Sequence, residues 1–397
     1  MSGETGHQVV VIGAGPAGVA SALALKDAGV PPLVLDQAGQ VASSWRGRYD
    51  RLRLNTWRRY SQLPDRPFPK GTPTFPSRDQ VVEYLDRHAH EEGLELRLGT
   101  RVQRIEPDEG GWRIRTTAGE ITTPQTVVAT GFENEPLIPE WPGRRTFAGE
   151  LIHARDYRNP EPFRDRSVLV VGPGCTGMEI SHDLADGGAR KVWLAVRTPP
   201  NITLRQGPGP VPGDVIAVAL WRWPERLSNA FANFGRRMDM GDLSEYGLPV
   251  PEEGIFARLR RLSVAPAIVD MEVIEAIKDR RIEIVAAVES LDETGVGLAD
   301  GARIEPDAVI AATGWRPALE PLAGHLGVLN ERGVPYAAQG QEAAPGLRFV
   351  GYKPLPAHLG HMGREAKRAA KEIAGAVAGP GSARAVPFAG RAQMARS

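Results

Sequence analysis

Two stretches of the chain repeat one pattern of apolar and polar positions. Residues 9–12 (VVVI) are all apolar, and a glycine-rich turn, an Ala-rich segment and a second apolar run (PLVLD) follow. A second series begins with SVLVV and ends with KVWLAVR. Unbroken apolar runs of this length are typical of parallel strands that are buried on both faces. The pattern therefore predicts two strand–helix–strand units, over residues 8–36 and 166–197.

A longer pattern follows each of these units. Residues 100–131 and 282–314 both read as short strands joined by polar turns that contain glycine. Each ends in an apolar strand, the tripeptide Ala-Thr-Gly and an aromatic residue, Phe132 or Trp315. This repeat predicts a three-stranded meander and a return strand after each unit. The fold class that we expect is therefore α/β, with two Rossmann-like dinucleotide-binding domains of one design.

The order of these segments predicts that the second domain is inserted in the first, because the final strand and helix fit best as the completion of the first domain. We expect the first domain to comprise residues 1–157 and 312–397, and the second to comprise residues 158–311. Within the second, residues 207–254 hold Pro and Gly clusters and an apolar, Trp-containing stretch, which predict helices and loops. That segment is either a surface excursion or a wall of the substrate pocket.

Composition and charge narrow the class of protein. The chain has 397 residues, 42% of them hydrophobic, and a formal net charge of +0, which gives no electrostatic case for binding nucleic acid or an anionic membrane. Its one cysteine, Cys175, excludes an internal disulfide, a CxxC redox pair and a zinc pair, so no metal site is expected. No apolar stretch approaches the roughly 18 residues of a membrane helix, and the polar N-terminus is unlike a signal peptide. These features favour a cytoplasmic location and leave the oligomeric state, a homo-oligomer included, open.

The first glycine-rich turn has the spacing of a dinucleotide-binding loop. Gly13 permits a tight turn, Gly15 lets the backbone approach a pyrophosphate, and Gly18 lets the helix pack closely on the strand. The helix N-terminus then offers free N–H groups and a favourable dipole to the phosphates. Asp36 ends the next strand, where a carboxylate can accept hydrogen bonds from both ribose hydroxyls. The alternative for Asp36 is a cap at the end of its strand.

The second turn has the same spacing at Gly172, Gly174 and Gly177, but its strand ends in Arg197 and Thr198, with no acid. A guanidinium there can pair with a 2′-phosphate, which favours NADPH over NADH. The alternative for Arg197 is a side chain that faces solvent. Two nucleotide sites with different strand ends indicate a bound flavin and a nicotinamide that reduces it. A disulfide reductase of this design needs a redox cysteine pair, which is absent, so a ferredoxin-type reductase and a monooxygenase remain.

The segment between the two turns separates these classes. Phe147, Gly149, His153 and Tyr157 have the spacing FxGxxxHxxx[Y/F], the fingerprint of class B flavin-dependent monooxygenases. The stretches SSWRGRYDRLRLNT, LPDRPFP, TFPSRDQVVEYL, YGLPVPEEG and PAIVDMEVIEAIKDRRIEIV also resemble the flavin-containing monooxygenase family. They are most similar to its YUCCA-like branch, the plant indole-3-pyruvate monooxygenases. The resemblance covers nearly the whole chain.

The resemblance implies an NADPH- and O2-dependent enzyme that uses a C4a-(hydro)peroxyflavin to oxygenate a small organic substrate. The expected reaction is N- or S-oxygenation, or oxidative decarboxylation of a 2-oxo acid such as indole-3-pyruvate. Asn55 and His153 become the catalytic candidates, Asn55 near the flavin C4a atom. The resemblance places these residues on FAD: Gly13, Gly15, Gly18, Asp36, Trp45, Arg51, Leu52 and Val102. It places these on NADPH: Gly172, Gly174, Gly177, Arg197 and Thr198. The neighbours also expected at a cofactor are Pro16, Ala17, Gln37, Ser44, Asn55, Thr56, Ala129, Thr130, Gly131, Cys175, Thr176, Ala312, Thr313, Gly314, Leu359 and Gly360.

Some positions depart from the family pattern. Residues 55–58 read Asn-Thr-Trp-Arg where the YUCCA-like branch has His-Leu-Pro-Lys, and Cys175 stands where the second turn has Asn. Tyr157 stands where the Baeyer–Villiger fingerprint ends in Trp. For His153 we favour a hydrogen-bonded hinge over a role in the oxygen chemistry. The alternative function is an FAD-dependent NAD(P)H reductase or oxidase that passes electrons to a protein or to O2.

Overall fold

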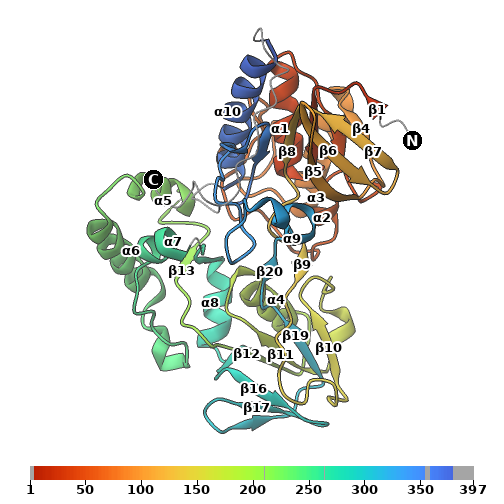
Figure 1. Ribbon diagram of the computed structural model, residues 1–397. Helices are drawn as coiled ribbons and strands as arrows, with labels where there is room; N and C mark the ends of the chain where they lie inside the picture. The colour runs from red at the N-terminus through yellow and green to blue at the C-terminus, as the bar shows by residue number, and fades with distance from the viewer. Residues whose placement is uncertain (1–3, 210, 263, 354–357, 379–397) are drawn as a thin grey trace. The chain divides into compact units, whose positions relative to one another are not determined.

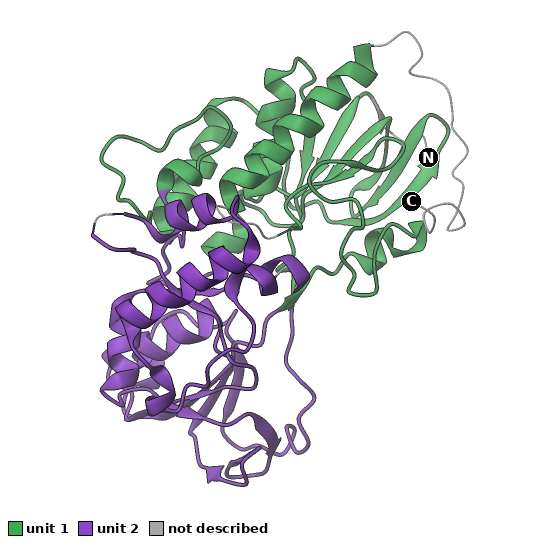
Figure 2. Ribbon diagram, turned by 90° about the vertical axis from the view of Figure 1, so that its left-hand side faces the viewer, with its two compact units in different colours: residues 1–46, 58–135, 315–397 green, residues 47–57, 136–314 purple. Residues whose placement is uncertain are grey.

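The structure, a computed structural model, describes residues 4–209, 211–262, 264–353 and 358–378 (Figure 1). The chain divides into two compact units, shown in different colours in Figure 2. Unit 1 comprises residues 1–46, 58–135 and 315–397, and unit 2 comprises residues 47–57 and 136–314. Part of the expected last segment, residues 379–397, lies outside the described residues.

These divisions differ from the expected ones at two places. Strand β10 (Glu150–His153) pairs in parallel with β19 (Ala308–Ala311) and therefore belongs to unit 2, although it precedes the expected boundary at residue 157. Residues 47–57 are also part of unit 2 and not of unit 1. Both differences have the same cause. Each segment packs on residues that lie far away in the sequence: β10 pairs with β19, and Arg51 of residues 47–57 pairs with Asp186.

Unit 1 is built on a six-stranded sheet in the order β21-β22-β8-β2-β3-β4, in which only β21 runs antiparallel to its neighbour. The strands are β2 (Val9–Ile12), β3 (Leu33–Leu35), β4 (Glu95–Arg97), β8 (Gln125–Val128), β21 (Glu342–Ala344) and β22 (Leu347–Phe349). Helix α1 (Pro16–Asp27) packs on β2 and β3 and also contacts α10 (His358–Ala378) and α3 (Arg78–Glu91). The predicted last strand thus joins the first sheet beside β8, and the predicted last helix packs on α1.

The other face of this sheet is covered by the predicted meander. Strands β5 (Val102–Asp108), β6 (Gly111–Thr116) and β7 (Gly119–Thr123) pair antiparallel, and β1 (Glu4–Thr5) lies parallel to β7. Ile105, Trp112 and Ile114 of the meander share one buried cluster with Val10 and Ile12 of β2. The alternate residues of β2 face α1, which explains why the whole strand is apolar.

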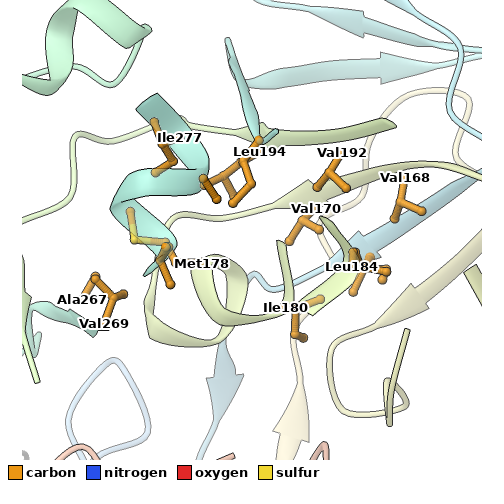
Figure 3. Close-up of a cluster of buried hydrophobic side chains, with 14 of the residues drawn as sticks. Val168, Val170, Met178, Ile180, Leu184, Val192, Leu194, Ala267, Val269 and Ile277 are labelled. Carbon is orange, nitrogen blue, oxygen red and sulfur yellow. The ribbon is translucent and has the colours of Figure 1, made fainter. Parts of the chain in front are cut away.

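Unit 2 repeats this arrangement on a five-stranded, all-parallel sheet in the order β10-β19-β11-β12-β15. The further strands are β11 (Ser167–Val171), β12 (Lys191–Ala195) and β15 (Glu283–Val285). Helices α4 (Cys175–Asp186) and α8 (Met271–Lys278) cover one face, where Figure 3 shows their side chains packed on Val168, Val170, Val192 and Leu194. The antiparallel strands β16 (Val288–Leu291), β17 (Val296–Leu298) and β18 (Arg303–Ile304) contribute to the cluster on the other face.

Residues 207–254 of unit 2 form helices and loops, as expected. They contain α5 (Gly213–Leu220), α6 (Glu225–Met240) and the 3-10 helix η3 (Leu243–Tyr246), and α7 (Ile255–Leu262) follows. Along α6 the side chains of Leu227, Phe231, Phe234 and Met238 recur at helical spacing and are all more than half exposed. The remaining elements are α2 (Ser43–Arg46), η1 (Arg58–Tyr60), β9 (Glu135–Pro136), η2 (Glu161–Phe163), β13 (Ile202–Leu204), β14 (Ala267–Val269), β20 (Trp315–Arg316), α9 (Glu320–Ala323) and η4 (Gly324–Leu326). None of the helices among the described residues is long and apolar enough to cross a membrane.

Candidate functional site

The first glycine turn joins β2 to α1, and its three glycines have different surroundings. Gly13 has a φ of +110°, and a Cβ atom there would lie 2.5 Å from the carbonyl oxygen of Ala129. A Cβ on Gly18 would lie 1.8 Å from the carbonyl oxygen of Gly13, so helix and turn pack without room for a methyl group. A Cβ on Gly15 would have nothing within 4 Å. The turn is therefore rigid on its protein side and open at its middle glycine, as a backbone cradle for phosphate requires.

Asp36 stands directly after β3, beside this turn. Its Oδ2 accepts a hydrogen bond from the Ala14 N–H at 2.6 Å, and its Oδ1 accepts one from the Ala38 N–H at 2.8 Å. The carboxylate thus does cap the end of its strand. Each oxygen has a second lone pair, so this cap leaves acceptor sites for ribose hydroxyls.

The second glycine turn, between β11 and α4, repeats the geometry of the first. Gly172 has a φ of +114°, and a Cβ there would lie 2.5 Å from the carbonyl oxygen of Ala312. A Cβ on Gly177 would lie 1.9 Å from the carbonyl oxygen of Gly172, whereas a Cβ on Gly174 would have nothing within 4 Å. Arg197 and Thr198, which follow β12, are exposed. The two turns therefore differ mainly at the strand end, which carries an acid in unit 1 and an arginine in unit 2.

Cys175 is the first residue of α4, and its side chain contacts protein. Its Sγ accepts a hydrogen bond from the Ile268 N–H at 3.2 Å and lies 3.6 Å from the Pro266 carbonyl oxygen. Burial raises the pKa of the Cys175 thiol to about 11. The thiol is therefore protonated near neutral pH and links α4 to β14 and to Pro266, the residue before that strand. No side chain caps the N-terminus of α4 at Gly174, so the first backbone N–H groups of the helix, beside half-buried Thr176, can bind a ligand.

The fingerprint residues have structural contacts within unit 2. A Cβ on Gly149 would lie 2.5 Å from the Phe147 ring and 3.0 Å from the Asp307 carbonyl oxygen, so the segment passes closely over its neighbours. Phe147 packs against the cluster on the meander side of the sheet. Tyr157 is 1% exposed and donates a hydrogen bond to Asp183 Oδ2 at 2.8 Å. The spacing of the fingerprint thus fixes the segment to the sheet and to α4.

His153 ends β10 and is 2% exposed. Its Nδ1 accepts a hydrogen bond from the Arg155 N–H at 3.0 Å, so its Nε2 carries the proton and donates to the Gly314 carbonyl oxygen at 3.1 Å. Burial lowers the pKa of His153. A neutral imidazole with a hydrogen bond at each ring nitrogen thus joins β10 to the Ala-Thr-Gly turn after β19 within unit 2, and the hinge role of His153 stays a prediction.

Residues 47–57 attach to unit 2 along their whole length. The Asp50 N–H donates to the Arg158 carbonyl oxygen at 2.8 Å, and Arg51 pairs with Asp186 at 3.0 Å. Leu52 packs against the core of unit 2. The Trp57 N–H donates to Asp214 Oδ2 at 2.9 Å, and Thr56 is half-buried. Arg51, Leu52, Asn55 and Thr56 therefore do not share a unit with the first glycine turn, and their assignment to FAD stays a prediction.

The other residues expected at a cofactor are divided between the two units. In unit 1, the Leu359 and Pro16 side chains line one narrow cleft, and a Cβ on Gly360 would lie 2.2 Å from the Tyr60 carbonyl oxygen. Thr130 Oγ1 hydrogen-bonds to the Tyr352 hydroxyl at 2.7 Å. The remaining positions in unit 1 are Ala17 in α1, Gln37 after β3, Ser44 and Trp45 in α2, Val102 in β5, and Ala129 and Gly131 after β8. In unit 2, Ala312, Thr313 and Gly314 follow β19, where Thr313 donates to the Leu137 carbonyl oxygen.

A buried polar cluster at Asn55 was not expected from the sequence. Arg205, 3% exposed, donates to Asn55 Oδ1 from Nη2 at 3.0 Å and from Nε at 3.3 Å. It also pairs with Glu179 and Asp270, and the Tyr49 hydroxyl donates to Glu179. Burial raises the pKa of Glu179, against the lowering effect of Arg205, and burial beside Glu179 raises the pKa of Tyr49. The one sequence signal is an arginine directly after an apolar strand, ITLR, which alone specifies no partner.

No metal site accompanies these groups: across the four described ranges, no cluster of three or more His, Cys, Asp and Glu side chains could hold a metal ion.

Comparison with known proteins places the chain in a family. Residues 10–204 match the family of pyridine nucleotide-disulphide oxidoreductases. The chain is 38% identical to the indole-3-pyruvate monooxygenase YUCCA1 of Oryza sativa subsp. japonica, over 77% of this chain and 76% of the relative. It is 37% identical to the probable indole-3-pyruvate monooxygenase YUCCA9 of Arabidopsis thaliana, over 77% of this chain and 74% of the relative.

The fold is similar to that of solved structures. A flavin-containing monooxygenase from Stenotrophomonas maltophilia superposes with a TM-score of 0.72 at 23% identity, covering 94% of this chain and 100% of that one. This similarity confirms the expected α/β fold. With the sequence relatives it identifies the protein's family: the chain belongs to the class B flavin-dependent monooxygenases, in their YUCCA-like branch.

Proposed function

We propose that the protein is an NADPH- and O2-dependent flavin monooxygenase with two Rossmann-like domains, in which unit 1 binds FAD and unit 2 binds NADPH. One observation carries the proposal: two glycine turns of the same geometry are followed by Asp36 in one unit and by Arg197 in the other. An acid at this strand end suits the ribose hydroxyls of FAD, and an arginine suits the 2′-phosphate of NADPH. The membership of the family supports the same pair of cofactors.

The residues at both turns fit these groups. The open space at Gly15 and Gly174 would admit a pyrophosphate, which the N-termini of α1 and α4 would bind through backbone N–H groups. Thr176 adds a hydroxyl at the second turn. The segments after β8 and β19 lie beside these turns, since the carbonyl oxygens of Ala129 and Ala312 pack against Gly13 and Gly172. When bound, NADPH supplies a hydride and FAD supplies the oxygen-activating chemistry.

The protein's own part in the reaction is binding, orientation and exclusion of water. Asn55 is the polar side chain that we assign to the reacting oxygen, where an amide N–H group would stabilise negative charge. His153 acts as a positioning residue that holds the end of β10 against the turn at Gly314. Residues 207–254 are the segment that we expect to select the substrate, because Asp214 of this segment accepts a hydrogen bond from the Trp57 N–H, two residues from Asn55.

The substrate class that we favour is a 2-oxo acid that loses CO2, with indole-3-pyruvate as the first candidate. Relatives at 38% and 37% identity bear the name of indole-3-pyruvate monooxygenases. Amines and sulfides that accept oxygen at N or S are the second class. Substrate and O2 are the partners that we propose, in a cytoplasmic enzyme.

The alternative, a reductase or oxidase, is tested by measuring whether the electrons from NADPH end in an oxygenated product or in hydrogen peroxide. The enzyme with bound FAD is reduced by NADPH without oxygen and then mixed with O2 while the flavin absorbance is followed. A monooxygenase reoxidises in two resolved phases and, with its substrate, forms about one product per NADPH. Reoxidation in one phase, with all electrons recovered as hydrogen peroxide under every substrate, would show that the protein is an oxidase. Screening 2-oxo acids, amines and sulfides in the same assay identifies the substrate class.

A further inference from the structure

The buried cluster at Asn55 holds the amide of that residue in one orientation. Arg205 approaches the Asn55 side chain with two N–H groups, and both reach Oδ1, at 3.0 and 3.3 Å. A guanidinium has donors and no acceptor. The Asn55 carbonyl oxygen must therefore face Arg205, and the Nδ2 amino group is turned away from it.

The guanidinium is itself held from two further sides. Glu179 of α4 and Asp270, which precedes α8, each accept a hydrogen bond from a different terminal nitrogen. Tyr49 donates to the second oxygen of Glu179. Arg205 is 3% exposed and the Glu179 side chain is 11% exposed, so water competes little with the bond between them. A guanidinium that is bonded to both carboxylates cannot follow a rotation of the Asn55 side chain.

We propose that Arg205 is a positioning residue that makes Asn55 present its amino group, and not its carbonyl oxygen, to the reacting oxygen. This inference rests on the role proposed above for Asn55. An amide that turns over about its last torsion keeps its shape but exchanges two donors for an acceptor. Donors stabilise negative charge on an oxygen, whereas a carbonyl oxygen repels it. Arg205 removes the unfavourable orientation before any cofactor binds.

The test begins with a variant designed to stay folded. Arg205→Met alone would leave Glu179 buried without its cation, so Arg205→Met is combined with Glu179→Gln. Asp270 keeps a side chain that is 45% exposed and is solvated without a partner. The control is Arg190→Met with Asp307→Asn, which removes another arginine–carboxylate pair of unit 2.

The first measurement needs no turnover. Protein labelled with 15N at asparagine is examined by NMR, and the side-chain NH2 pair of Asn55 is assigned by its loss in Asn55→Ala. We expect two separate, slowly exchanging signals in the unaltered protein and in the control. In the Arg205 variant we expect them to move toward the values of a free amide. Signals that stay unchanged in the Arg205 variant would overturn the proposal.

The second measurement separates this inference from the function on which it rests. In the enzyme with bound FAD, the Arg205 variant should release severalfold more hydrogen peroxide per NADPH, while its flavin is reduced at an unchanged rate. In the Asn55→Ala background the same change should add nothing further, and an additive effect would show that Arg205 does not act through Asn55. If Asn55→Ala itself stays fully coupled, the proposed role of Asn55 fails, whereas the NMR result still shows whether Arg205 holds the Asn55 amide.

Discussion

At the scale of single residues, Arg197 and His153 are candidate functional residues in two different environments. Arg197 is an exposed side chain after β12, available to a ligand. His153 is buried, and both of its ring nitrogens bond to backbone groups. We therefore expect Arg197 to act through its charge and His153 to act by holding two segments of the chain together.

The charge of Arg197 leads to a prediction on coenzyme choice. We expect Arg197→Ala to raise the KM for NADPH about 10- to 100-fold, because a hydrogen bond between charged groups contributes about 1.5–3 kcal/mol. The KM for NADH should change little, since NADH lacks the 2′-phosphate. Steady-state kinetics with both coenzymes measure this, with Arg303→Ala in the meander as the control. Equal losses for both coenzymes would contradict the assignment.

For His153, replacement by Ala removes two hydrogen bonds from a buried position. We expect the free energy of unfolding to fall by about 1–3 kcal/mol, and reduction of FAD by NADPH to slow. The hydrogen peroxide released per NADPH should stay as it was. His182→Ala, another buried histidine of unit 2, controls for lost stability alone. Intact reduction with increased peroxide would show that His153 takes part in the oxygen chemistry.

The sequence predicted the geometry of the glycine turns and the positions of the strand ends. Both were predictable because each lies within one strand–helix–strand unit. Arg205 was not, because its contact with Asn55 joins positions 150 residues apart. The packing of residues 47–57 on unit 2 was missed for the same reason, since ion pairs such as Arg51 with Asp186 depend on the folded chain.

At the scale of elements, the two glycine turns show how strand, turn and helix share one design. In both, the third glycine packs against the first and the second stays open. The meanders were predictable as well, because turn glycines separate strands of regular length. Helix α6 was expected only as a helix, and no sequence pattern shows that its apolar row is exposed.

The glycine turn of unit 2 allows stability to be separated from binding. Gly177→Ala places a methyl group 1.9 Å from the Gly172 carbonyl oxygen, so we expect a large fall in the melting temperature. Gly174 has φ −76° and ψ 178°, which suit any residue, and open space around it. Gly174→Ala should therefore keep the melting temperature but raise the KM for NADPH at least about tenfold. Calorimetry and coenzyme kinetics on both variants check this. A Gly174→Ala protein with an unchanged KM for NADPH would contradict the proposal that this turn binds the pyrophosphate.

At the scale of the whole molecule, buried histidines make stability depend on pH. Burial lowers the pKa of His358 to about 4, and neither of its ring nitrogens has a hydrogen-bond partner among the residues described. Because the unfolded chain binds the proton near pH 6.5 and the folded one does not, stability is lost as the pH falls below that value.

We expect His358→Leu to remove this dependence of stability on pH. The melting temperature of the variant, compared with that of the unaltered protein, should rise progressively between pH 7 and pH 5. The ring contact with Phe132, at 5.6 Å, is apolar and tolerates the change. Thermal unfolding of the protein without cofactors measures the difference at each pH. A difference that does not vary with pH would place the protonation of His358 outside this range.

The division of the chain also sets an order of events during synthesis. Unit 2 comprises residues 47–57 and 136–314, so all of its sequence exists once residue 314 has left the ribosome. Unit 1 must wait for β22, which lies between β21 and β8 in its sheet, and for α10, which packs on α1. Until then β8 is an unpaired sheet edge, a feature that favours aggregation. Unit 1, whose first segment precedes unit 2 in the chain, thus finishes folding after unit 2.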